Sequence, residues 1–301
     1  MRLFWAWPSE LRAKGIFGIN ARNLGMLSQL NPREFYPRVD DKVITKEICK
    51  ANDIPTPETY AVIRFFGDVG RLDEMLAPAD GDRARESFVI KPARGAAGRG
   101  VLVIAGREGD ALVTPSGRRV PPDEIRYHLA TTLSGLYSLG GRPDRAIIEE
   151  RILPHDVFSA ISVGGTPDIR VVVHKGAPLM AMLRLPTNAS GGRANLHQGA
   201  VGAGVDIKTG RTVGGVCRGA FVETHPDSGN PIGDLHVPFW DKVIDISTRL
   251  SKALELGYCG VDIVLDINRG PLVLEANARP GLAIQVANRC GIARRLPAEP
   301  E

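Results

Sequence analysis

Two polar residues, Glu275 and Asn277, stand two positions apart at the end of the apolar segment LVLEANA. Because side chains alternate between the faces of a strand, both project to the same side. The preceding run VDIVLD contains Asp262, and the residues DINRG between the runs are typical of a tight turn, so we expect an antiparallel hairpin. Two carboxylates and an amide oxygen on one face suit a Mg2+ ion. The alternative is a hairpin whose polar residues merely face water.

A glycine-rich loop, ARGAAGRG, follows the apolar run SFVIKP and its Lys91. It matches neither G-x-x-x-x-G-K-[ST] nor G-x-G-x-x-G, and it lies between two predicted strands instead of before a helix. Backbone N–H groups around Gly95, Gly98 and Gly100 can nevertheless form an anion nest over phosphates. Lys91 would add a positive charge there. The alternative is an ordinary hairpin turn beside a surface lysine.

The composition describes an ordinary globular protein, with 301 residues, 43% hydrophobic and 24% charged. Two or three lobes are expected at this length. The formal net charge of +4 comes from scattered basic residues, which fits an anionic ligand and does not indicate nucleic acid. The cysteines have no zinc-binding or C-x-x-C spacing and are typical of reduced thiols in a cytoplasmic protein: Cys49, Cys217, Cys259 and Cys290.

The N-terminal segment MRLFWAWPSELRAKG contains an apolar run that Pro8 interrupts. The run is too short for a signal sequence or a membrane span, so we expect a strand or a packing arm. Peripheral membrane contact through Phe4, Trp5 and Trp7 is the alternative.

Strands and separated helices alternate without a strict βαβ order, which predicts an α+β protein. We expect a helix after Asp40 or Asp41 that ends near Asn52, and a Gly/Ser/Asn-rich loop over residues 187–204. Two amphipathic helices are predicted from their periodicity. Residues 122–138 form the first, with Ile125, Leu129, Leu133 and Leu136 on one face, and the second has Trp240, Val243, Ile246, Leu250 and Leu254 on one face and stops at Gly257.

Taken in order, these segments resemble the ATP-grasp superfamily, and most closely the RimK-type glutamate ligases and their α-L-glutamate ligase-like relatives, the sugar-transfer-associated type included. The resemblance runs from about residue 40 to about residue 285. It implies an α+β fold in which two lobes with antiparallel sheets clasp ATP. On this basis we expect an N-terminal arm (1–40), a small lobe with the glycine-rich flap (41–148) and a large lobe with the metal triad (149–301).

The resemblance also implies roles for individual residues. Lys42 and Lys91 are similar to the two lysines of the family's nucleotide site, and Glu149, Glu150 and Ile152 resemble the segment that reads adenine. The remaining positions are Asp156 for the ribose, Arg184, Arg193 and Asn195 for the transferred phosphoryl group, Arg279 in the closing turn, and Asp262, Glu275 and Asn277 as the magnesium triad. For His197 a solvated position and a site role are both open.

The chemistry that the resemblance implies is amide formation at the expense of ATP. A carboxylate takes the γ-phosphoryl group to give an acyl phosphate, and an amine then displaces phosphate. We expect ATP and Mg2+ as cofactors, with Mn2+ as a substitute, and glutamate or a similar amino acid with a peptide or small-molecule acceptor as substrates. RimK-type ligases carry a further domain before the first lysine, where this sequence has only about forty residues, so the acceptor stays open.

Two other functions stay open from the sequence. One is an ATP-binding regulatory module without ligase activity, and the other is a phosphotransferase that stops after phosphoryl transfer. For all three we expect a cytoplasmic protein without nucleic-acid partners, and the oligomeric state is undetermined between a monomer and a homo-oligomer.

Overall fold

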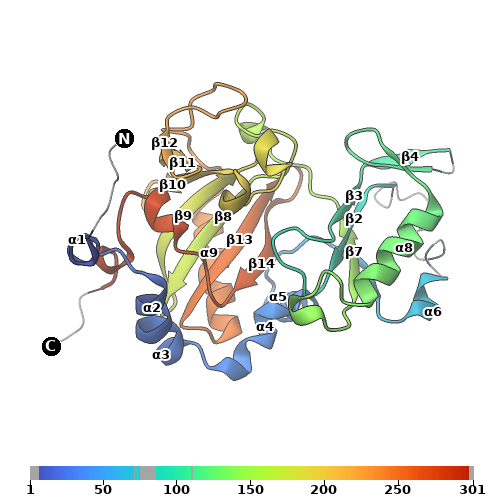
Figure 1. The fold of residues 1–301 in the computed structure, drawn as a ribbon, viewed down its shortest axis with the longest axis horizontal. Helices are drawn as coiled ribbons and strands as arrows, with labels where there is room; N and C mark the ends of the chain where they lie inside the picture. The colour runs from blue at the N-terminus through green and yellow to red at the C-terminus, as the bar shows by residue number, and fades with distance from the viewer. Residues whose placement is uncertain (1–6, 71, 73, 75–85, 110, 298–301) are drawn as a thin grey trace. The chain divides into compact units, whose positions relative to one another are not determined.

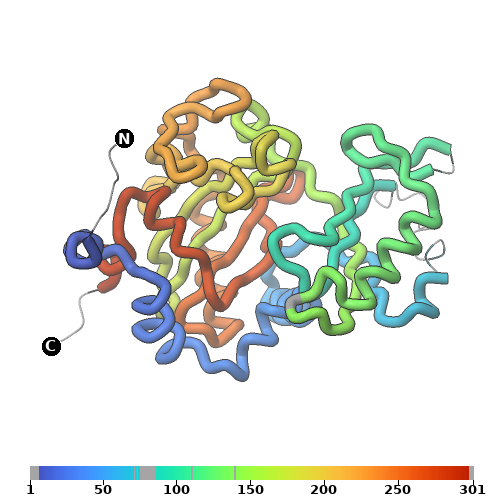
Figure 2. The backbone as a smooth tube through the Cα atoms, in the orientation of Figure 1, coloured from blue at the N-terminus to red at the C-terminus, as the bar shows by residue number. Residues whose placement is uncertain are grey.

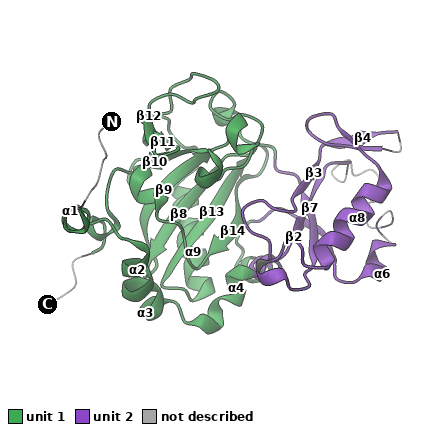
Figure 3. Ribbon diagram, viewed as in Figure 1, with its two compact units in different colours: residues 1–40, 47–55, 153–301 green, residues 41–46, 56–152 purple. Residues whose placement is uncertain are grey.

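The computed structural model describes residues 7–70, 72, 74, 86–109 and 111–297. The chain forms two compact units, which Figure 3 distinguishes by colour. Unit 1 comprises residues 1–40, 47–55 and 153–301, and unit 2 comprises residues 41–46 and 56–152. Among the described helices, none combines the length and the apolar character needed to cross a membrane.

Unit 1 is built on a seven-stranded antiparallel sheet with the order β12-β11-β10-β9-β8-β13-β14 (Figure 1). Lys175 and Gly176 join β8 to β9 in a tight turn with positive φ angles of 48° and 76°. The strands are β8 (Asp168–His174), β9 (Ala177–Leu185), β10 (Val201–Val205), β11 (Thr212–Cys217), β12 (Ala220–Val222), β13 (Tyr258–Asp266) and β14 (Gly270–Asn277).

Helix α9 (Trp240–Leu254) packs against this sheet through the apolar face that its periodicity predicts. Its five predicted core residues are all buried. The helix ends earlier than predicted, because Glu255 adopts the left-handed conformation with φ 56°. Gly257 serves instead for a close approach, since a Cβ there would lie 2.9 Å from the Cβ of Leu30.

The described N-terminal segment of unit 1 is helical from Pro8 onward, and the apolar run for which a strand or a packing arm was predicted lies mostly in residues 1–6, outside the described residues. Figure 2 shows this blue segment beside the red C-terminal segment. Gln285 joins them, because its side chain bonds both the N–H and the C=O of Phe17. The helices here are α1 (Pro8–Ala13), α2 (Ile19–Arg22), a π-helical turn (Asn23–Leu27), α3 (Ser28–Leu30), α4 (Pro37–Asp40) and α10 (Ala283–Ala287).

Unit 2 contains a four-stranded antiparallel sheet with the order β1-β7-β2-β3 and a smaller sheet β4-β5-β6. Helix α5 (Lys42–Ala51) begins in unit 2 and continues into unit 1. The Asp41 side chain accepts a bond from the Val43 N–H, as expected of a residue that precedes a helix. The other elements are β1 (Thr59–Ile63), α6 (Phe66–Val69), β2 (Phe88–Pro92), β3 (Leu102–Ile104), β4 (Gly106–Glu108), β5 (Ala111–Val113), β6 (Arg119–Val120), α8 (Pro122–Leu133) and β7 (Ala146–Glu150).

Two predicted boundaries are wrong. Helix α8 ends at Leu133 and not at residue 138, because Gly135 turns the chain with φ 88°, and Leu136 is therefore exposed instead of lying on the apolar face. The loop predicted over 187–204 ends sooner, because Val201–Val205 forms β10 inside the sheet. Small residues obscured this strand, since Gly202 and Gly204 leave room for Leu196 and for the Ala287 backbone.

Candidate functional site

The predicted hairpin is present, and it places Asp262 of β13 directly opposite Glu275 of β14. The register shifts by one residue after Asp262, because Ile263 pairs with Val273. Without this bulge Asp262 would face Leu274, so the bulge is what brings the two carboxylates together. Asn277 lies on the same strand as Glu275, and its amide nitrogen is 3.5 Å from Asp262 Oδ2.

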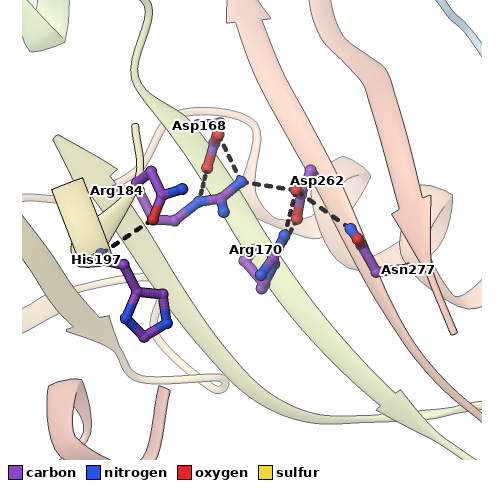
Figure 4. Close-up of polar contacts among 7 residues, drawn as sticks. Asp168, Arg170, Arg184, His197, Asp262 and Asn277 are labelled. Atoms are coloured by element: carbon purple, nitrogen blue, oxygen red, sulfur yellow. Dashed lines mark hydrogen bonds and ion pairs between the residues drawn. The ribbon is translucent and has the colours of Figure 1, made fainter. Parts of the chain in front are cut away.

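Two arginines from neighbouring strands bind Asp262 (Figure 4). Arg170 of β8 donates from Nε to Oδ1 at 2.7 Å and from Nη2 to Oδ2 at 2.5 Å. Arg184 of β9 donates from Nη2 to Oδ2 at 2.7 Å, and it also forms a two-bond ion pair with Asp168. Asp168 lies opposite Arg184 and Arg170 opposite Asp262 in the strand register, so the sheet itself fixes these pairs.

Burial and ion pairing act in opposite directions on the pKa values of these carboxyl groups. Burial alone would raise the pKa of Asp262, but the charges of Arg170 and Arg184 outweigh it and lower the pKa. Burial raises the pKa of Asp168, which has Arg184 as its bonded partner and Asp262 as a like charge nearby. Asp262 is therefore the more firmly ionised carboxylate.

The donor atoms of the triad fit a magnesium ion. Asp262 is fully buried, and a carboxylate offers about four lone-pair sites, of which the arginines take three. Oδ1 accepts only one of these arginine bonds, and Glu275 and Asn277 are only half-buried. Half a turn of the Asn277 amide would present its oxygen, because the two amide atoms are interchangeable in shape. Within the described part of the chain, no group of three His, Cys, Asp or Glu side chains forms a metal cluster, so the amide is needed to complete the set.

In unit 2, Glu149 of β7 lies buried between two lysines. It forms ion pairs with Lys91 of β2 and with Lys46 of α5, the latter at 2.8 Å. Burial alone would raise the pKa of Glu149, but the charges of Lys91 and Lys46 outweigh it and lower the pKa. The three groups together carry one net positive charge, which suits an anionic ligand.

The first residues of the glycine loop are held by Asp41 and Lys42. Lys42 Nζ donates to the Gly95 carbonyl at 2.7 Å. The buried carboxylate of Asp41 pairs with Arg94 at 3.0 Å and with Arg145. These contacts fix the start of the loop, whereas residues 97 to 99 at its tip are exposed.

The far end of the loop is also fixed. Gly100 has φ 70°, and a Cβ there would lie 2.4 Å from the Tyr137 ring, so this position requires glycine. The Gly100 carbonyl lies 3.0 Å from His128 Nε2. Burial lowers the pKa of His128, which favours the neutral ring that donates this bond. Gly98 also has a positive φ of 70°, at the exposed tip.

The remaining predicted residues form none of the bonds described above around Asp262 and around Glu149. Glu150 accepts a bond from the Glu58 N–H at 3.0 Å, Ile152 is half-buried and Asp156 is exposed. Arg193 is exposed, and no described residue bonds its guanidinium group. Arg279 lies over the Tyr36 ring at 4.8 Å.

The Asn195 side chain accepts a bond from the His197 N–H at 3.0 Å and so begins a short turn. The His197 bond in Figure 4 involves its backbone, and its side chain is exposed.

Sequence reasoning missed the ion pairs of both clusters, and three of them show why. The Lys46–Glu149 pair had a usable signal, because Lys42 and Lys46 are four residues apart and share a helix face. The Arg170–Asp262 and Arg184–Asp262 pairs had none, since they depend on the strand register.

Comparison with known proteins identifies the family. The model of the sugar-transfer associated ATP-grasp family matches residues 21–298. No curated protein matches this sequence.

Several solved structures are similar to this chain. The ATP-grasp ligase PsnB, complexed with its minimal precursor, is 15% identical, with 88% of this chain and 59% of that chain covered and a TM-score of 0.45. D-alanine–D-alanine ligase from Bacillus anthracis, complexed with ATP, is 17% identical, with 83% and 58% covered and a TM-score of 0.45. A RimK domain ATP-grasp protein from Sphaerobacter thermophilus is 15% identical, with 89% and 71% covered and a TM-score of 0.45. This chain spans less than two thirds of PsnB and of the D-alanine–D-alanine ligase.

The family match covers most of the chain and agrees with the α+β architecture of antiparallel sheets and separate helices. The predicted fold class is thereby confirmed, and the chain belongs to the sugar-transfer associated ATP-grasp family.

Proposed function

We propose that this protein is an ATP-dependent carboxylate–amine ligase that forms an amide through an acyl phosphate. The observation that carries the proposal is the pairing of Asp262 with Glu275 beside Asn277, on a hairpin of a chain that belongs to the ATP-grasp family. Two carboxylates and an amide form the oxygen-rich set that binds Mg2+ through one or two carboxylates and substrate phosphates.

In this proposal each unit contributes its own groups to nucleotide chemistry. Lys91 and Lys46 in unit 2 would supply positive charge for the phosphates, and N–H groups of the glycine loop would bind their oxygens. In unit 1 Asp262, Glu275 and Asn277 would hold the metal ion, which neutralises charge on the phosphoryl oxygens when it is bound.

Further residues are proposed for the transferred phosphoryl group and for the nucleoside. Arg193 has an exposed guanidinium group that no described residue bonds and that suits a phosphoryl oxygen. Arg184 uses Nε and Nη2 for Asp168 and Asp262, so among its bonds to described residues Nη1 stays available. Asn195 is proposed for the same phosphoryl group and Arg279 for the closing turn. Lys42, Glu149, Glu150, Ile152 and Asp156 remain the proposed nucleotide contacts. We propose an amino acid similar to glutamate as one substrate and a peptide or small molecule as the other.

The test is hydroxamate formation with Mg-ATP and hydroxylamine over a panel of carboxylates that includes glutamate and glutamyl peptides. Hydroxylamine traps an acyl phosphate whatever the natural amine is. We expect a signal with one class of carboxylate, its loss in Glu275→Gln, and its retention in Glu223→Gln, which changes an exposed glutamate of the same unit.

Other outcomes favour the alternative functions. ATP binding without hydroxamate or ADP would contradict ligase activity and favour a regulatory module. ADP formation that needs only a hydroxyl acceptor would favour a phosphotransferase. A fully active Glu275→Gln protein would remove the proposed metal triad.

A further inference from the structure

Asp262 has an unusual environment for a metal ligand, because two guanidinium groups already bind it. Arg170 and Arg184 donate three bonds to its carboxylate, one to Oδ1 and two to Oδ2. Asp262 has 0% of its surface exposed, so solvent screens these charges little. A divalent cation that approaches Oδ1 therefore meets the repulsion of two nearby positive charges.

The net charge of the residues around Asp262 also disfavours metal binding without a nucleotide. Three carboxylates, those of Asp168, Asp262 and Glu275, stand against two guanidinium groups, which leaves one net negative charge when all are ionised. Mg2+ gives up its water reluctantly and usually needs substrate phosphates among its ligands. One negative charge offsets only half of the charge of a divalent cation, and the polyphosphate of a nucleotide would supply the rest.

We propose that Arg170 and Arg184 make metal binding conditional on the nucleotide, so that the nucleotide-free protein holds a divalent cation only weakly. The proposal rests on the function proposed above and adds a rule for the order in which the site fills. Asp168 enters the proposal through its charge, because it forms a two-bond ion pair with Arg184 and adds one negative charge to the cluster.

The experiment measures Mn2+ binding by the full-length protein without nucleotide, from the EPR signal of free Mn2+ at about pH 8, where carboxylates are ionised. Arg184→Gln removes one positive charge beside Asp262, so we expect Mn2+ to bind about tenfold or more tightly than to the wild type. Asp168→Asn removes one negative charge and should weaken binding further. The double variant restores the net charge and should return the affinity to near the wild-type value.

This pattern separates a charge effect from damage to the fold, because damage would weaken Mn2+ binding in both single variants. Arg184→Lys keeps the positive charge but loses the planar fork of N–H groups. Without nucleotide, this variant should bind Mn2+ as weakly as the wild type does. The matched control is Arg211→Gln, which breaks the exposed ion pair with Asp234 in the same unit and should leave Mn2+ binding unchanged.

The outcomes distinguish this inference from the proposed function. Mn2+ binding by the wild type with AMP-PNP, measured beyond what AMP-PNP binds alone, should require Glu275 and tests the metal triad. Its absence would overturn the triad and the inference together. Two other results would overturn the inference alone, when the wild type does bind Mn2+ with AMP-PNP. One is that, without nucleotide, Arg184→Gln binds Mn2+ no more tightly than the wild type does. The other is that the wild type binds Mn2+ as tightly without nucleotide as with AMP-PNP.

Discussion

Glu149 is buried between Lys46 and Lys91, and the stability of unit 2 depends on all three charges. Glu149→Gln would remove the negative charge that Lys91 and Lys46 share. We expect it to lower the free energy of unfolding by about 3 kcal/mol. Urea unfolding measures this loss. Glu108→Gln is the matched control in the same unit, because its pair with Arg119 is exposed, and a loss of similar size there would contradict the assignment.

The same residue predicts a pH dependence. Because the pKa of Glu149 is lowered in the folded protein, its stabilising contribution is complete above the ordinary value of 4.5. The contribution is lost as pH falls through the lower, folded-state pKa. The wild type should therefore lose more stability on acidification than Glu149→Gln does, and equal losses would show that the ion pairs contribute nothing.

Sequence patterns predicted residue types in the candidate site better than their bonds. The alternation in LVLEANA predicted that Glu275 and Asn277 share a face, and the hairpin confirms the neighbouring strand of Asp262. The bulge at Leu274 that aligns Asp262 with Glu275 has no signature in the sequence, because one extra residue in a strand leaves the apolar pattern nearly intact. Partners such as Arg170 depend on strand order, which a local pattern does not contain.

At the scale of elements, the glycine loop is fixed at both ends by contacts with other segments. Gly100→Ala would place a Cβ against the Tyr137 ring at a backbone conformation that alanine rarely adopts. We expect unit 2 to lose about 2 kcal/mol of stability. Nucleotide affinity should fall with it, since the loop end would shift, and fluorescence titration with a labelled nucleotide measures this.

Two further variants test the reason for that loss. Gly106→Ala changes a glycine with open space around it and an ordinary backbone, so its effect should be below about 1 kcal/mol. The double variant Gly100→Ala/Tyr137→Ala removes the collision but not the backbone strain. Gly100→Ala should therefore cost less stability in the Tyr137→Ala background than in the wild type, but it should still cost some. An equal cost in both backgrounds would rule out the collision with Tyr137.

Element types followed from periodicity, whereas element ends did not. Trp240 through Leu254 show a helical repeat that the tertiary structure obeys. The end of α8 was missed because Leu136 continues the repeat by chance, while Gly135 already has a left-handed conformation. Periodicity reports which face of a helix is buried, and it says less about where the backbone turns.

At the scale of the whole molecule, Asn31 joins the N-terminal segment to the first residue of β13 and to the residue that follows β14. Its amide donates to the carbonyls of Tyr258 at 2.6 Å and Ala278 at 2.9 Å, and its oxygen accepts from the Tyr258 N–H at 2.9 Å. Asn31→Ala would leave these buried backbone groups unsatisfied. We expect a loss of about 3 kcal/mol in the free energy of unfolding of unit 1.

Amide hydrogen exchange of the hairpin measures the local part of this effect. The control is Asn230→Ala, which removes one exposed side-chain bond to the Ala160 carbonyl and should change stability by less than about 1 kcal/mol. If exchange at Tyr258 is as slow in Asn31→Ala as in the wild type, the side chain does not hold the strand.

The two compact units are interleaved in sequence, because unit 1 contains residues from both sides of unit 2. Unit 2 is complete at Ile152, whereas unit 1 resumes at Leu153 and ends with the chain. Synthesis proceeds from the N-terminus, so unit 2 can fold on the ribosome before the strands of unit 1 exist. Asn31 and Phe17 must wait for Tyr258 and Gln285, which emerge 227 and 268 residues later. The N-terminal helices therefore lack their final partners during most of translation. We expect a chaperone that binds the nascent chain to bind this segment.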